Sequence, residues 1–112
     1  MAVKETSDDR LIFELLNNER VILKYHTDTC GEICLKLKVV YDELSEGGIY
    51  NDIAFLRINA DNNPIALKHI NERKQPIMNI YHNGFLVECR TVDTKERIED
   101  LLNKLATFNT KK

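Results

Sequence analysis

Residues 21–34 constrain the fold of this chain more than any other stretch. Residues 21–25 form a nearly continuous apolar run, which is typical of a strand covered on both faces of a sheet. A polar turn at residues 26–29 follows, and Cys30 and Cys34 then open a segment with helical apolar spacing. Thiols at the start of a helix lie beside unpaired N–H groups and the positive end of the helix dipole, which favour the nucleophilic thiolate. The stretch therefore predicts a strand-to-helix turn suited to dithiol–disulfide chemistry.

The composition excludes several classes of function. The 112 residues suit one domain, 1–112, with a polar tail at 107–112. A formal net charge of -2 without a dense basic patch predicts no nucleic-acid binding, and the apolar runs are too short to span a membrane. The first residues lack the hydrophobic core of a signal peptide, so we expect a cytoplasmic protein. In a reducing compartment, a close pair among three cysteines indicates redox activity or metal binding.

Apolar spacing and end signals predict four helices. Their expected starts are Ser7 or Asp8, then Cys30, then Asn63 with Pro64, and last a capping box of Asp93 with Glu96. The first helix is expected to end at Asn17-Asn18, and the second at Gly47-Gly48. Their apolar residues at helical spacing are Leu11, Ile12, Leu15 and Leu16; Ile33, Leu37, Val40, Tyr41 and Leu44; Ile65, Leu67 and Ile70; and Ile98, Leu101, Leu102 and Leu105.

Four strands are predicted between these helices. Residues 21–25 and 53–58 are joined by a helical crossover, so they are expected to lie parallel. Residues 77–82 and 85–89 flank Asn83-Gly84, a pair that supplies the two positive φ angles of a type I′ hairpin turn. The alternation of helices and strands predicts an α/β fold, a mixed sheet with helices on both faces.

This order of elements, with a cysteine pair at the first strand-to-helix turn, resembles the thioredoxin family over nearly the whole chain. Three segments match the family: Asp61-Asn-Asn-Pro64 before the third helix, Pro76 at its cis-proline, and Tyr81-His-Asn-Gly84 at its hairpin turn. The resemblance implies a thioredoxin-like fold with a central mixed sheet of four to five strands. It also implies a protein-disulfide reductase with Cys30 and Cys34 as catalytic residues. Partner proteins would then dock at Gln75, Pro76, Thr29 and Gly31.

The chain departs from the family pattern at the residues expected to carry out the reaction. Three residues, not two, separate Cys30 from Cys34. Lys24 stands where the family has a buried proton-relaying aspartate, and Arg57 corresponds to the lysine that partners it. Two cations there would repel each other. Either a nearby carboxylate must pair with one of them, or one side chain must extend toward solvent. The sequence does not identify that carboxylate.

The charges near the cysteines are expected to shift their thiol pKa values in opposite directions. Glu32 would disfavour the thiolate and Lys24 would favour it, and Arg57 and His26 are further neighbours that could shift the thiol pKa. On a regular helix, Cβ atoms four residues apart are too distant for a disulfide. Cys30 must therefore leave the helical register to bond Cys34, and Gly31 is the residue that permits this.

Two other functions use the same residues. One is a redox-inactive thioredoxin-fold module that binds partners without turnover. The other is a metal site, either zinc on His26, Cys30 and Cys34, or an iron–sulfur cluster shared between two subunits. Our main hypothesis is an oxidoreductase that needs no metal or cofactor. It requires a reductase to recycle the disulfide, and we expect it to act as a monomer. Cys89 is expected to be a buried small hydrophobe.

Overall fold

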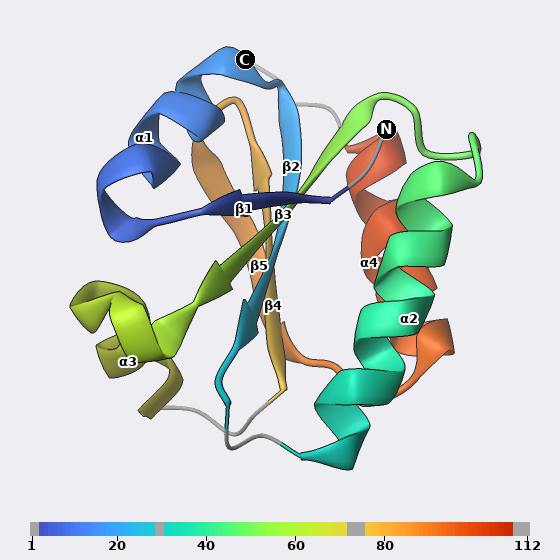
Figure 1. The fold of residues 1–112 in the computed structure, drawn as a ribbon. Helices are drawn as coiled ribbons and strands as arrows, with labels where there is room; N and C mark the ends of the chain where they lie inside the picture. Colours follow the sequence, from blue (N-terminus) through green and yellow to red (C-terminus); the bar gives the residue numbers. More distant parts are fainter. Residues whose placement is uncertain (1–2, 29–30, 72–75, 109–112) are drawn as a thin grey trace.

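The computed structural model describes residues 3–28, 31–71 and 76–108 (Figure 1). The helices are α1 (Asp8–Asn17), α2 (Glu32–Glu46), α3 (Pro64–Asn71) and α4 (Lys95–Thr107), with a short 3₁₀ helix, η1 (Ala60–Asn62). The strands are β1 (Lys4–Thr6), β2 (Arg20–His26), β3 (Ile53–Asn59), β4 (Ile77–His82) and β5 (Phe85–Thr91). None of the helices in the described ranges is both long and apolar enough to cross a membrane.

The strands of the described residues form one mixed sheet in the order β1-β3-β2-β4-β5. β3 pairs in parallel with both β1 and β2, whereas β4 pairs antiparallel with β2 and β5. The register sets Lys24 of β2 beside Arg57 of β3 and Met78 of β4. The predicted parallel pair and hairpin are therefore confirmed, and the two predicted cationic residues are neighbours across β2 and β3.

Helices cover both faces of the sheet, with α2 and α4 on one face and α1 and α3 on the other (Figure 1). The core on the α2 and α4 side includes Ile22, Leu37, Tyr41, Phe55, Met78, Ile80, Ile98, Leu101, Leu102 and Leu105. The core on the α1 and α3 side includes Val21, Leu23, Tyr25, Leu56, Ile58, Ala66, Ile70 and Ile77. Successive residues of β2 thus point to opposite faces, and β2 is buried on both, as its apolar run predicts.

Several local signals in the sequence give the structure they predict. The side chain of Ser7 caps α1 by accepting a hydrogen bond from the Arg10 N–H, and α3 begins at Pro64. Asn83 and Gly84 have φ angles of 53° and 85°, the positive values of the predicted hairpin turn. The cap of α4 was predicted wrongly. Its N-cap is Thr94, whose hydroxyl accepts from the Arg97 N–H, because a threonine hydroxyl satisfies a free helix N–H as well as a carboxylate does.

Two features differ from the predictions. β1 was not predicted, because its sequence, KET, has no apolar run. Ile12 and Leu16 are exposed on α1, and Ile33 is exposed on α2, where Cys34 is buried instead. For both helices one apolar pattern is compatible with two helix rotations, and packing against the sheet selects one. The predicted end of α2 at Gly47-Gly48 is confirmed, since the helix ends at Glu46 and Gly48 has a φ of 85°.

Candidate functional site

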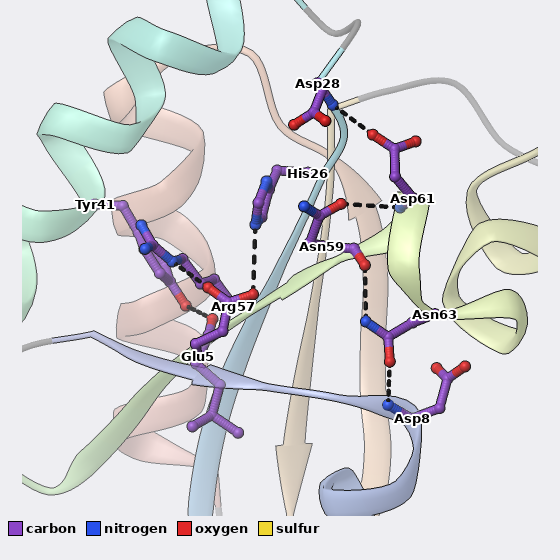
Figure 2. Close-up of polar contacts among 10 residues, drawn as sticks. Glu5, Asp8, His26, Asp28, Tyr41, Arg57, Asn59, Asp61 and Asn63 are labelled. Carbon is purple, nitrogen blue, oxygen red and sulfur yellow. Dashed lines mark hydrogen bonds and ion pairs between the residues drawn. The ribbon is translucent and has the colours of Figure 1, made fainter.

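The loop after β2 is held in place by the 3₁₀ helix η1. The backbone N–H of Asp28 donates to the carboxylate of Asp61 over 2.8 Å, and the Asn59 side chain accepts from the Asp61 N–H over 2.9 Å (Figure 2). Asn63 extends this network by donating to the carbonyl of Asn59. The chain that leaves β2 is therefore fixed to the end of β3 just before the cysteine segment. Thr29 and Cys30, which come next, lie outside the described residues.

Gly31 turns the chain into α2. Its φ of 92° and ψ of -159° lie in a region that residues with a Cβ rarely adopt, and it occupies the N-cap position of the helix. Its carbonyl accepts the helical hydrogen bond from the Leu35 N–H. A Cβ placed on Gly31 would meet nothing within 4 Å, so conformation, not space, requires glycine here.

Cys34 lies in the first turn of α2 and is 8% exposed. It is disulfide-bonded, whereas Cys89 is not part of a disulfide. The neighbouring Glu32 and Ile33 are exposed, so the helix turns its cysteine toward the sheet and these two residues toward solvent. At Cys34 the positive end of the helix dipole favours a thiolate, whereas burial opposes it.

Lys24 is buried on β2, with 3% of its surface exposed. Burial, followed by repulsion from Arg57, lowers the pKa of its ammonium group from 10.5 to about 8. The carboxylates of Asp42 and Glu5 oppose this shift only in part. Near neutral pH, Lys24 therefore holds a charge that its surroundings disfavour.

Glu5 on β1 is the carboxylate that forms an ion pair with Arg57. Its two oxygens lie 2.7 Å from the Arg57 guanidinium and 3.7 Å from the Nε2 of His26 (Figure 2). Burial and the charge of Lys24 lower the pKa of His26, and Glu5 acts in the opposite direction. Nothing in the KET sequence identifies Glu5, since the parallel pairing of β1 with β3 is what brings it beside Arg57.

A pocket of about 300 Å³ adjoins Cys34. It lies between the ends of β2 and β3 and the first turns of α2, and its walls are Lys24, His26, Thr27, Asp28, Gly31, Cys34, Leu35, Lys38 and Arg57. The structure therefore brings four of the predicted site residues, Lys24, His26, Gly31 and Arg57, around Cys34. Glu32 does not line this pocket.

Comparisons with known proteins agree with this geometry. A family model described as Thioredoxin matches residues 2–107. The chain belongs to the thioredoxin family. The search of curated proteins found no match.

Thioredoxins of known structure share the fold at low sequence identity. Thioredoxin f from spinach chloroplast is 21% identical, with a TM-score of 0.83 over 95% of each chain. The oxidised thioredoxin of Plasmodium falciparum is 23% identical, with a TM-score of 0.80 over 95% of this chain and 100% of that one. The thioredoxin of Malassezia sympodialis is 14% identical, with a TM-score of 0.82 over 96% of each. At these identities the likeness shows the fold.

Of the predicted docking residues, Gly31 lines the pocket and Pro76 does not. Pro76 is buried at the start of β4, and its carbonyl accepts a hydrogen bond from the Val92 N–H over 2.8 Å. Gln75 lies outside the described residues, as do Thr29 and Cys30. Among the described ranges, no group of three or more His, Cys, Asp and Glu side chains is arranged to hold a metal ion.

The thioredoxin fold also places Cys89 beside His69, a pair that sequence reasoning missed. The Cys89 sulfur lies 3.5 Å from the His69 Nε2, and the His69 ring contacts Tyr25 with centroids 5.0 Å apart. Cys89 is half-buried against the core of the α1 and α3 side, which corrects the expectation of a fully buried residue. β5 is an edge strand whose side chains are only partly covered. No local signal predicts this contact, because α3 reaches β5 only in the folded chain.

Proposed function

We propose that the chain is a thiol–disulfide oxidoreductase that acts on disulfides of partner proteins through Cys30 and Cys34. The observation that carries the proposal is Cys34, a buried and disulfide-bonded cysteine in the first turn of α2. Membership of the thioredoxin family supports the same activity. Because the chain has three cysteines and Cys89 is not disulfide-bonded, the proposal assigns Cys30 as the disulfide partner of Cys34.

The proposed reaction has two exchange steps. The Cys30 thiolate attacks one sulfur of the partner disulfide, which forms an intermolecular disulfide and releases the other partner sulfur as a thiolate. The Cys34 thiolate then attacks the Cys30 sulfur, and the second partner sulfur leaves as a thiolate. Both partner thiolates take up protons, so the partner gains two electrons and Cys30 and Cys34 become a disulfide. A cellular reductase returns the two electrons, and we place this cycle in the cytoplasm.

Lys24 is proposed to modulate the thiol of Cys34, with which it lines one pocket. Its pKa of about 8 is close to that of an ordinary thiol, so the amine can accept the proton that Cys34 loses. In its charged form Lys24 instead stabilises the Cys34 thiolate. Arg57 and His26 add to the local field, and Glu32 opposes it from the first turn of the helix.

Partner proteins are proposed to dock beside Pro76, where an extended segment could add to the backbone at Gln75. Thr29 and Gly31 would form the facing side of this docking site. In this arrangement the protein acts as a monomer of one domain, 1–112, because the cysteines and the docking residues all come from one chain.

The test is a set of single cysteine variants assayed on insulin, a protein with accessible disulfides. We expect reduced wild-type protein to reduce insulin, and Cys34→Ser to accumulate a conjugate with an insulin chain that dithiothreitol cleaves. Cys30→Ser should form no conjugate, and Cys89→Ser should retain the activity. Mass spectrometry after thiol alkylation identifies the conjugate and its bonded cysteine.

Other outcomes would assign the chain to the other classes. If wild-type protein reduces no disulfide and a Cys30→Ser/Cys34→Ser double variant binds partners as well as wild type does, the chain is a binding module. A visible absorption band with bound iron or zinc in anaerobically purified protein would identify a metal site. Either result would contradict the proposed oxidoreductase.

A further inference from the structure

The pocket beside Cys34 contains a buried cation without a counter-ion. Lys24 lines the pocket and is 3% exposed, and no hydrogen bond or ion pair of its ammonium group is found among the described residues. At a pKa of about 8, most Lys24 side chains are charged at pH 7. A buried charge without a partner is strongly unfavourable, so this site gains stability from any anion that reaches it.

The other cations of the pocket already have carboxylate partners. Lys38 lies 3.3 Å from Asp42, and Arg57 lies 2.7 Å from Glu5. These ion pairs neutralise Lys38 and Arg57, whereas the buried Lys24 has no ion pair among the described residues.

Two further titratable groups line the pocket. The Nε2 of His26 is buried without a hydrogen-bond partner, and the nearest oxygen of Glu5 is 3.7 Å away. Asp28 is the carboxylate residue among the described walls, and it is exposed. Because the Nε2 of His26 has almost no accessible surface, the buried group of the pocket that an oxyanion can pair with is the Lys24 ammonium group.

We propose that this pocket binds a small free oxyanion of the carboxylate class. A carboxylate oxygen of the ligand pairs with the Lys24 ammonium group. The volume of about 300 Å³ is at the lower end of the range for small-molecule sites and suits a ligand of a few carbon atoms. The bound anion lies next to Cys34, the residue through which the proposed exchange passes.

The position of the pocket favours a free molecule over an acidic side chain of a docked partner. The pocket is formed by β2, β3 and α2, on the β3 side of β2. Pro76, where partners are proposed to dock, directly precedes β4, which lies on the opposite side of β2 from β3. Gly31 belongs to both the pocket wall and the proposed docking site, but the walls from β2 and β3 lie away from Pro76, so the pocket suits a small free anion better than a side chain docked at Pro76.

Protonation of Lys24 should make the binding depend on pH. The groups that set its pKa are Arg57 and Lys38, which lower it, and Asp42 and Glu5, which raise it. A bound carboxylate adds a further negative charge and raises the pKa again, so anion binding and protonation favour each other. Affinity should decrease as the pH rises above about 8.

The test is a titration of ¹⁵N-labelled protein with succinate at pH 7, with ionic strength held constant by sodium chloride. We expect saturating chemical-shift changes at the amides of residues 24, 26, 35 and 38, and none with the uncharged analogue succinamide. Lys24→Met should weaken the affinity at least tenfold, whereas Lys36→Met, on the exposed side of α2, should change it less than twofold. At pH 9.5, wild-type affinity should decrease several-fold.

Linear shifts without saturation, equal responses to succinate and succinamide, or undiminished affinity in Lys24→Met would each overturn the proposal. If Lys24→Met does not fold, Lys24→Gln removes the same charge and should also weaken the affinity at least tenfold. Binding does not depend on the proposed redox activity, so succinate binding and insulin reduction are measured separately on the wild-type protein. Loss of insulin reduction with intact succinate binding would therefore contradict the proposed function and leave the anion site standing.

Discussion

Gly31 illustrates how one residue controls the entry to the cysteine helix. Its φ of 92° at the N-cap of α2 is a conformation that costs residues with a Cβ roughly 1–3 kcal/mol. Gly31→Ala should therefore lower the free energy of unfolding by about that amount, without any steric clash. Urea denaturation of the oxidised protein measures the effect.

Gly47, at the other end of α2, provides the matched control. Its φ of -75° is ordinary for any residue, and a Cβ there would make only normal contacts. Gly47→Ala should change the free energy of unfolding by less than about 1 kcal/mol or increase it slightly. Equal destabilisation by the two substitutions would contradict a conformational role for Gly31.

Lys24 makes the stability of the protein depend on pH. Its folded pKa of about 8 lies below the unfolded value of 10.5, so folding opposes its protonation. The penalty is fully present below about pH 8 and disappears as the pH rises to about 10.5. Lys24→Met should therefore stabilise the protein by roughly 3 kcal/mol at pH 6–7, from the difference between 10.5 and about 8 at the usual ~1.36 kcal/mol for each pKa unit.

The gain in unfolding free energy should shrink toward zero between pH 8 and pH 10, and urea denaturation across this range measures it. Comparing each variant with wild type at the same pH removes the contribution of other titrating groups. Lys36→Met, at an exposed position, should show no such trend. A gain from Lys24→Met that does not change with pH would show that packing, and not charge, is responsible.

At the scale of elements, α1 and α3 cap each other. The Asp8 carboxylate accepts hydrogen bonds from the N–H groups of Ile65 and Ala66, over 2.8 and 3.1 Å, at the start of α3. The Asn63 side chain in turn accepts from the Asp8 N–H over 2.8 Å at the start of α1 (Figure 2). Each helix therefore satisfies free N–H groups of the other.

Asp8→Ala should lower the free energy of unfolding by about 1–2 kcal/mol, because it leaves two N–H groups of α3 without their acceptor. Asp9→Ala, one residue along the same turn, should cost less than about 0.5 kcal/mol because no such contact is lost. Thermal unfolding of both variants distinguishes them. A similar loss in both would mean that the charge near the α1 dipole matters more than the contact with α3.

Local signals predicted those elements whose cause is local. Asn63-Pro64, Asn83-Gly84 and the apolar spacing of residues 98–105 each determine structure within a few residues, and each prediction is confirmed. β1 has no such signal, since it becomes a strand only by pairing with β3. The missed strand carries Glu5, so the carboxylate beside Arg57 could not be predicted either. The contact of His69 with Cys89 was missed for the same reason.

At the scale of the whole molecule, helices on the two faces of the sheet bury their apolar residues to different extents. The inward residues of α4, including Leu101 and Leu102, are at most 1% exposed, as their spacing predicts. On the opposite face α1 leaves Ile12 and Leu16 exposed, although their spacing resembles that of α4. A helical pattern indicates which residues share a stripe, but the position of the helix over the sheet decides how much of that stripe is covered.

Two leucine substitutions test this asymmetry. Leu102 is fully buried in the core of the α2 and α4 side, so Leu102→Ala removes apolar contacts and leaves a cavity, and should cost about 2–5 kcal/mol. Leu16 is 74% exposed, so Leu16→Ala should change the unfolding free energy by less than about 0.5 kcal/mol. Urea denaturation at pH 7 measures both. A loss above 2 kcal/mol for Leu16→Ala would mean that this residue is covered in solution, and that α1 meets a surface absent from the isolated chain.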